Sequence, residues 1–340
     1  MPGPAFGASE AQNLSFPLRE IPGQLTDRSL FFVRDHFSEP ELSIETWTLR
    51  IEGCVARPCE LTFSDLIELP TRKIEAVLEC AGNVAGGSAV SNGIWEGVAL
   101  NSLLALAGTS PQGNAVAFEG ADGGRLFQDS PVLPYSQIVP IEKCLQPDSI
   151  VAFKLNGLFL PSRNGFPARA LFPGWYAMDS VKWLRRIIVR GCGQGFSSFH
   201  ESGMDRLYRR VYRLENGNTR TVRLSTIQIK SAIAWPGDGT KLAAGRHSVW
   251  GFAWSGTDVI RNVAVSIDGG KNWDAAKLEA APGPFRWVRW SYSWAASPGD
   301  YHLMSRAMDA SGNEQPAERD RTRRDYYELN WSPQLHCSVR

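Results

Sequence analysis

The sequence lacks the features that would place it at once in a membrane or nucleic-acid-binding class. Its 340 residues contain no uninterrupted apolar run near the roughly 18 residues that a membrane helix needs. It has no lysine-rich arm and no zinc-finger spacing, and its formal charge of +1 gives no bulk attraction to nucleic acid. We therefore expect no membrane span and no nucleic-acid partner.

The start of the chain also lacks the pattern of a secretory signal peptide. Met1 is followed by PGPAFGASEAQNLSFPLRE, which has neither a basic start nor an apolar core. We expect the chain to be cytoplasmic as it stands, or periplasmic if a leader was removed before the first residue. The sequence leaves the compartment open between these two.

Cysteine is sparse, and the six residues do not have the spacing of a disulfide framework or a zinc site. They stand at positions 54, 59, 80, 144, 192 and 337. Cys54 and Cys59 either pair or are buried thiols, and buried thiols are the commoner state in a chain of this length.

Length and patterning predict two domains, because 340 residues exceed what one hydrophobic core usually organises. The first part mixes strand-like TWTLRIEG with helix-like LNSLLALAG. From about Ser231, alternating segments such as HSVWGFAWSG and FRWVRWSYSW are separated by turns, which is typical of an antiparallel β-sandwich. We expect an α+β protein with a mixed α/β domain at 1–225 and an immunoglobulin-like sandwich at 226–340, the boundary falling between Arg220 and Trp235.

A cysteine at the end of a predicted strand is the first candidate for chemistry. The segment VLECAGN delivers Cys80 into AGNVAGG, whose small residues let the backbone approach a bound group closely. A thiolate in such a loop is a candidate ligand for a soft metal, or a nucleophile. On the loop alone, a buried structural cysteine is the commoner outcome.

A second loop has side chains that suit an anion. The segment RNGFPARALFPGWYAMDSVKW gathers Asn164, Arg169, Ser180 and Lys182 around glycine and proline turns. Arginine offers a planar fork that matches phosphate, lysine offers a point charge, and serine or backbone N–H groups can complete the site. A solvated surface loop with ordinary salt bridges is an equally good interpretation of the spacing.

An extended segment upstream, FFVRDHF, carries a third pair of candidates. Arg34 and His36 stand two residues apart, so their side chains share one face of the segment. A lone histidine more often has a structural role than a functional one. The role of His36 therefore depends on which other residues lie beside it in the fold.

These segments occur together, in one order, with further motifs in the second half. FFVRDHF, ECAGN, NGFPARALFPGW and SVKWL are followed by WSG, VSIDGGKNW and SRAMDASGNEQP. In this combination, from about residue 30 to 330, the chain resembles the sulfite oxidase family of molybdopterin enzymes. The resemblance implies a mixed α/β domain that holds the cofactor, followed by an immunoglobulin-like domain that pairs two subunits into a homodimer.

The resemblance also implies roles for single residues. Cys80 matches the molybdenum-bound cysteine of ECAGN, whose thiolate binds the metal beside the dithiolene of the pterin. Arg34 falls where an arginine faces the oxygen ligands of the metal. Tyr208, in DRLYRR, resembles the active-site tyrosine, with one more structural aromatic residue as the alternative. The positions that grip the pterin and its phosphate correspond to His36, Asn164, Arg169, Ser180 and Lys182.

Departures from the family pattern fall mainly on the substrate side. Val84 and Ala85 stand where sulfite oxidases commonly have an arginine pair, and the loop to Trp95 lacks the tryptophan of the sulfite pocket. The segment WSGTDVIRNVAVS has no arginine at the expected place unless Arg261 substitutes. Asn164 replaces a histidine, as in branches that reduce oxidised methionine or oxidise other sulfur compounds.

We therefore expect a molybdenum-dependent oxidoreductase that transfers oxygen atoms and oxidises sulfite or a related sulfur compound. The sequence has no CxxCH motif, so no haem segment is expected and electrons leave to an external carrier such as a cytochrome. A reductase of S-oxides or N-oxides on the same cofactor is the alternative in the opposite direction. The alternative that is not an enzyme is a catalytically impaired, dimeric protein that binds the cofactor.

Overall fold

The computed structural model describes residues 11–126, 128–129, 131–191, 204, 207–322, 327 and 329–340. Of the residues that the structure describes, 46% lie in strands and 9% in helices, so this part of the protein is mostly β. The helices are short, which makes the mixture in the first part less even than the sequence pattern predicts. Within the described ranges, no helix is both long enough and apolar enough to cross a membrane.

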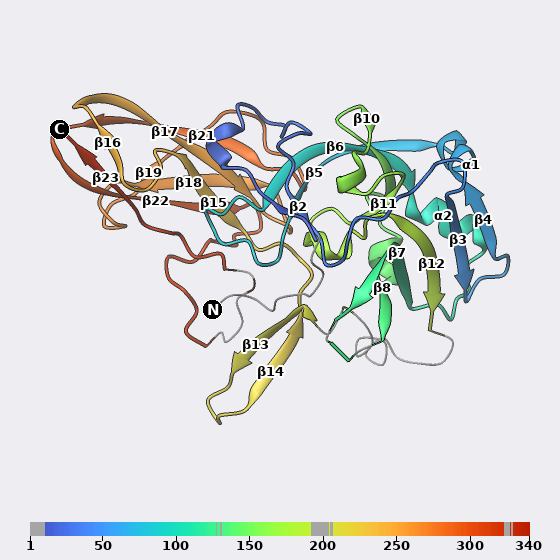
Figure 1. Cartoon of the computed structure of the whole chain (residues 1–340). Coiled ribbons are helices and arrows are strands. Elements are labelled where there is room, and N and C mark those ends of the chain that lie inside the picture. The colour runs from blue at the N-terminus through green and yellow to red at the C-terminus, as the bar shows by residue number, and fades with distance from the viewer. Residues whose placement is uncertain are drawn as a thin grey trace.

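A five-stranded mixed sheet lies at one end of the molecule (Figure 1). Its order is β4-β3-β12-β7-β8, and β12 runs parallel to β3 and antiparallel to β7. The strands are β3 (Thr48–Gly53), β4 (Cys59–Thr62), β7 (Ala115–Arg125), β8 (Val132–Pro140) and β12 (Leu184–Arg190). The helices are α1 (Phe63–Glu68), α2 (Leu100–Ala107) and α3 (Ile141–Cys144).

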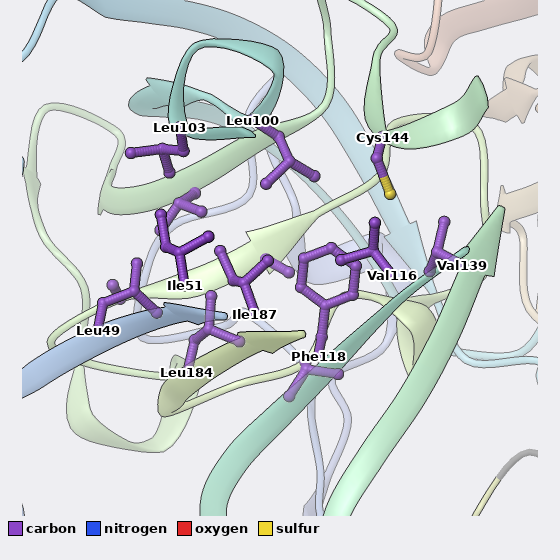
Figure 2. Packing of buried hydrophobic residues seen from close by; sticks show 14 of the residues in the cluster. Leu49, Ile51, Leu100, Leu103, Val116, Phe118, Val139, Cys144, Leu184 and Ile187 are labelled. Carbon is purple, nitrogen blue, oxygen red and sulfur yellow. The ribbon is translucent and has the colours of Figure 1, made fainter. Parts of the chain in front are cut away.

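The core beneath this sheet follows from the alternation of its strands. Side chains point to opposite faces of a strand in turn, so apolar residues two positions apart meet on one side. Leu49 and Ile51 of β3 therefore face Ile187 of β12 and the apolar face of α2, as Figure 2 shows. All these side chains are fully buried.

A second five-stranded sheet carries the loop of Cys80. Its order is β10-β9-β6-β5, with β11 paired to β9. The strands are β5 (Thr71–Glu79), β6 (Val90–Ala99), β9 (Ile150–Leu155), β10 (Leu158–Phe159) and β11 (Arg169–Leu171). Because β5 ends at Glu79, Cys80 opens the loop that leads to β6.

The second half of the chain forms two antiparallel-rich sheets at the other end of the molecule (Figure 1). One contains β15 (Lys230–Trp235), β17 (Gly245–Trp254), β20 (Lys277–Leu278) and β21 (Val288–Ala296). The other contains β16 (Thr240–Leu242), β18 (Ile260–Ser266), β19 (Asp274–Ala275), β22 (Gly299–Asp309) and β23 (Leu335–Val339). One hydrophobic cluster takes side chains from both sheets, including Trp290 and Leu303.

Smaller elements lie between these two ends. The short strands are β1 (Asn13–Leu14), β2 (Val33–Arg34), β13 (Arg209–Arg213) and β14 (Thr219–Arg223), and the hairpin of β13 and β14 projects from the body (Figure 1). The 3-10 turns are Leu18–Glu20, Ser162–Asn164 and Ala177–Asp179. A further cluster joins Val77 and Ala81 to Phe252 and Trp254, so the two halves share buried apolar surface.

The structure corrects one expectation about the cysteines. Cys54 belongs to a disulfide, whereas Cys59 is a free thiol, so these two residues do not pair. Cys80, Cys144 and Cys337 are also free. Nearness in the sequence was a poor guide because Cys59 lies opposite Ile51 in the pairing of β4 with β3, whereas Cys54 lies beyond the end of β3.

Candidate functional site

The residues selected from the sequence line a single cleft. Its empty volume is about 670 Å³, part of it open to solvent. The selected residues on its wall are Arg34, His36, Cys80, Asn164, Arg169, Ser180, Lys182 and Tyr208. They come from segments up to 174 positions apart in the chain, so the fold, and not local sequence, brings them together.

A tight turn presents Cys80 to this cleft. The Asn83 N–H donates to the Cys80 carbonyl at 2.9 Å, and the Cys80 N–H donates to the Ala89 carbonyl at 3.0 Å. A Cβ atom at Gly87 would lie 2.5 Å from Asn83 Oδ1, so only glycine fits there. The turn is thereby fixed on both sides of the half-buried thiol.

The electrostatics at Cys80 have two opposing parts. Burial raises the pKa of the Cys80 thiol, while the nearby Arg34 and Lys230 cations act to lower it. The Arg34 side chain is exposed and makes no hydrogen bond or ion pair with any described residue, although its backbone pairs with Asn13 of β1. Its guanidinium can therefore bind a ligand beside the thiol.

Two backbone carbonyls and an aromatic ring hold the Arg169 side chain in place. It donates to the Asn164 carbonyl at 3.0 Å and to the Ser180 carbonyl at 2.7 Å, and its guanidinium lies 5.3 Å above the centre of the Trp95 ring. Burial lowers the pKa of Arg169 to about 9, opposed by Tyr135 and Asp35. The side chain thus remains a cation at neutral pH in a fixed orientation.

Lys182 is held by a buried acid. It forms an ion pair with Asp35 and donates to the Arg163 carbonyl at 2.9 Å. Burial lowers the pKa of Lys182 and raises that of Asp35, and each partner opposes the shift of the other. Ser180 accepts from the Phe172 N–H at 3.1 Å, which leaves its own hydroxyl proton available to a ligand.

An aromatic group closes another wall of the cleft. The Tyr208 hydroxyl and His36 Nε2 are 2.5 Å apart, and the His36 ring lies 5.1 Å from that of Tyr135. Burial, with Arg34 and Lys182 nearby, lowers the pKa of His36 to about 3, so the imidazole is neutral at physiological pH. Burial keeps the pKa of Tyr208 well above its usual value, so its hydroxyl keeps its proton.

Sequence reasoning missed two acids and a tyrosine on the same wall: Asp35, Asp122 and Tyr135. Burial raises the pKa of Asp122 to about 7, with Lys182 opposing. Asp122 stands alone in EGADGGR on β7, where no motif marks it. Asp35 lies between Arg34 and His36, and strict alternation would have turned it away from their face.

Four buried polar atoms of the wall have no hydrogen-bond partner among the described residues. They are Asp35 Oδ2, Asp122 Oδ1, Asn164 Oδ1 and Arg169 Nε. Buried polar groups are nearly always satisfied in folded proteins, so a cluster of exceptions needs an explanation. A polar ligand with both donors and acceptors would satisfy all four.

The substrate side of the cleft is poorer in charge. Val84 is exposed, the Ala85 N–H donates to the Leu329 carbonyl at 2.9 Å, and Trp95 is fully buried beneath Arg169. Arg261 is an exposed residue of β18 and does not line the cleft, so it does not replace the missing arginine. Arg209 lies on β13, also off the lining, and Arg206 lies outside the described residues.

Comparisons with known proteins agree along most of the chain. Residues 36–193 match the model of an oxidoreductase molybdopterin binding domain, and residues 222–331 match that of a Mo-co oxidoreductase dimerisation domain. Sulfite oxidase of Gallus gallus is 31% identical over 86% of this chain and 68% of its own length. Mitochondrial sulfite oxidase of Mus musculus is 30% identical over 86% of this chain, which spans only 58% of that relative. The solved structure of the sulfane dehydrogenase SoxCD from Paracoccus pantotrophus is 29% identical, with a TM-score of 0.85 over 97% of this chain and 85% of that one.

Proposed function

The chain belongs to the sulfite oxidase family of molybdopterin-dependent oxidoreductases, and we propose that Cys80 is the protein ligand of its molybdenum ion. The observation that carries this proposal is the cleft, which is lined by Cys80, by buried cations and by residues with unpartnered polar atoms. A soft thiolate suits molybdenum better than the harder oxygen ligands nearby. A ligand that fits this wall must be both polar and partly anionic.

The pterin part of the cofactor fits the other polar residues that line the cleft with Cys80. Arg169 and Lys182 are buried cations that suit a phosphate, and the Ser180 hydroxyl can donate to it. Asp35, Asp122 and Asn164 have unpartnered oxygens that can accept from the N–H groups of a pterin ring. We therefore assign these residues, with His36, to cofactor binding.

The chemistry of the reaction is assigned to the cofactor, which supplies two-electron redox chemistry and oxygen-atom transfer when bound. The protein orients the substrate. Arg34 offers a guanidinium with no bond to the described residues, and Tyr208 offers a hydroxyl group that its hydrogen bond with neutral His36 holds in place. Arg34, Cys80 and Tyr208 are thus the proposed catalytic residues.

The substrate we propose is a reduced sulfur compound, with sulfite as the weaker candidate. A doubly charged oxyanion needs several cations. In the described part of the chain four arginine or lysine side chains line the cleft, and three of them already bond to the protein: Arg163, Arg169 and Lys182. A sulfane group of low charge needs fewer, and the likeness to a sulfane dehydrogenase supports it. These similarities do not favour an S-oxide or N-oxide reductase or a catalytically impaired protein.

The assembly we propose is a homodimer formed through residues 226–340, with residues 1–225 as the catalytic domain. The match to a dimerisation domain and the two sheets that share one core support an immunoglobulin-like pairing unit. Electrons are proposed to leave to a separate carrier such as a cytochrome. The disulfide at Cys54 favours the periplasmic alternative, because disulfides persist in oxidising compartments.

Metal and pterin analysis of the purified protein tests the cofactor assignment, and light scattering at micromolar concentration tests the dimer. The substrate is tested by following reduction of an artificial electron acceptor with sulfite, thiosulfate and a panel of organic sulfanes. Turnover with sulfanes and not with S-oxides supports oxidation. Reduction of S-oxides by a reduced dye, without oxidation of any sulfur compound, would show the opposite direction.

A further inference from the structure

A fully buried ion pair joins the Cys80 loop to the second half of the chain. Glu79 is the last residue of β5, and Lys230 is the first residue of β15. Lys230 Nζ lies 2.5 Å from Glu79 Oε1, and both side chains are 0% exposed. Lys230 Nζ also donates to the Asn83 carbonyl at 2.7 Å. One ammonium group therefore holds the chain immediately before Cys80 and again three residues after it.

Two further hydrogen bonds complete this network. Asn83 Nδ2 donates to Glu79 Oε1 at 2.9 Å, and Trp254 Nε1, at the end of β17, donates to Glu79 Oε2 at 2.9 Å. Both carboxylate oxygens of Glu79 are thus satisfied. The Asn83 N–H closes the turn onto the Cys80 carbonyl. Two strands of the second half therefore fix both flanks of the turn.

The network of Glu79, Asn83, Lys230 and Trp254 lies in apolar surroundings, so its polar groups need a reason other than stability. Val77, Ala81, Ala232 and Phe252 belong to one hydrophobic cluster with Trp254. Apolar side chains of similar volume often stabilise such a place at least as well as a buried ion pair. What a fully satisfied polar network adds is a single defined geometry, because each bond has a required distance and direction.

We propose that Glu79, Asn83, Lys230 and Trp254 form a clamp through which the second half of the chain positions Cys80 for molybdenum. Lys230 is accordingly a positioning residue, and it acts on the metal through the turn at residues 80–83. The second half then has a task within each subunit besides pairing subunits. This inference rests on the proposed role of Cys80 as the metal ligand.

The test compares holoenzyme variants by metal content and by the electron paramagnetic resonance signal of partly reduced molybdenum. Lys230→Met removes the ammonium, and Trp254→Phe removes one hydrogen bond while the ion pair stays. Asp309→Asn is the matched control, because Asp309 is a fully buried acid of the same half, bonded to Ser255, Thr257 and Asn313 and away from the turn.

Loss of an outer contact to a metal ligand typically costs about 10- to 100-fold in metal affinity or activity. We expect Lys230→Met to weaken molybdenum binding at least about tenfold, to lower molybdenum content and to shift the signal of the remaining loaded molecules. Trp254→Phe should shift the signal in the same direction by less, and Asp309→Asn should match the wild type. Wild-type content and signal in folded Lys230→Met would overturn the clamp. If Lys230→Met does not fold, a wild-type signal in Trp254→Phe overturns it instead.

Cys80→Ser separates this inference from the proposal on which it rests. If metal content and signal are unchanged in Cys80→Ser, then Cys80 is not the metal ligand. The clamp is then overturned as well. Loss of the signal in Cys80→Ser, together with wild-type signals in Lys230→Met and Trp254→Phe, would overturn the clamp alone.

Discussion

The two walls of the cleft are built in different ways. On one wall Arg169 and Lys182 are buried, bonded to backbone carbonyls or to Asp35, and fixed over the rings of Trp95 and Trp183. On the other wall the exposed Arg34 side chain bonds to no described residue, and Val84 and Ala85, in the loop that follows Cys80, carry no charge. The first wall is made to hold one fixed anionic group. The second leaves room for substrates to differ, so the family is easier to identify than the substrate.

The largest expected effect comes from removing the atom that joins the two walls. Cys80→Ser replaces a soft sulfur by a hard oxygen without enlarging the side chain, so we expect the protein to fold and turnover to fall at least about 10³-fold. Metal content and turnover are measured on the same sample. Cys59→Ser, at another half-buried free thiol, should match the wild type. Wild-type turnover by Cys80→Ser would show that the two walls do not share a metal.

The next effect tests how little charge the second wall carries. Each missing charge-assisted hydrogen bond costs about 1.5 to 3 kcal/mol, so the loss of two weakens sulfite binding by about 10² to 10⁴-fold. We expect a millimolar Michaelis constant for sulfite, or no turnover. Steady-state kinetics at low and high salt measure this Michaelis constant. A micromolar constant that rises with salt would mean that cations outside the described cleft reach the substrate.

The first wall is tested by removing its cations one at a time. Arg169→Ala and Lys182→Ala each leave phosphate oxygens without a charge-assisted partner, a loss of about 1.5 to 3 kcal/mol in cofactor binding. Bound pterin and molybdenum per chain should fall, while the Michaelis constant of the loaded molecules stays the same. Arg186→Ala, which removes surface ion pairs to Glu52 and Glu119, should keep full occupancy. Full occupancy with a raised Michaelis constant would place Arg169 or Lys182 on the substrate side instead.

The difference between the walls also explains what the sequence could predict. Cys80, Arg169 and Lys182 stand in recognisable segments, and their placement on one cleft followed from motif order. Asp122 was missed because it is a single acid on β7, a strand that the fold places between β12 and β8. The Glu79 and Lys230 pair was missed because 151 positions separate the two residues. Local patterns carry no information about partners that only the packed fold creates.

The fold shows the same limit. Alternation predicted the strand-rich second half from about Ser231, and β15 begins next to it at Lys230. Pairing between distant segments, such as parallel β3 and β12, could not be read from either strand alone. The domain limits at residue 225 and the roles of the site residues stay predictions that the experiments above address.

The smallest expected effect concerns Asp122, whose burial raises its pKa to about 7. Its neutral form is favoured in the folded protein, whereas the unfolded chain ionises it near pH 4. The folded state therefore binds more protons between about pH 4 and pH 7, and stability falls as pH rises through this window. Above it the buried carboxylate costs about 1 to 2 kcal/mol, because water in the open cleft relieves part of the penalty.

Asp122→Asn should remove this cost, so cofactor-free protein should gain about 1 to 2 kcal/mol at pH 8 and nothing at pH 4. Urea unfolding at the two pH values measures the change against the wild type, and Glu68→Gln, at an exposed acid of α1, should leave the wild-type dependence intact. With cofactor bound the sign should reverse, because the carboxylate oxygen then accepts from a pterin N–H that an amide matches less well. An Asp122→Asn variant that stabilises the loaded and the cofactor-free protein equally would show that Asp122 does not contact the cofactor.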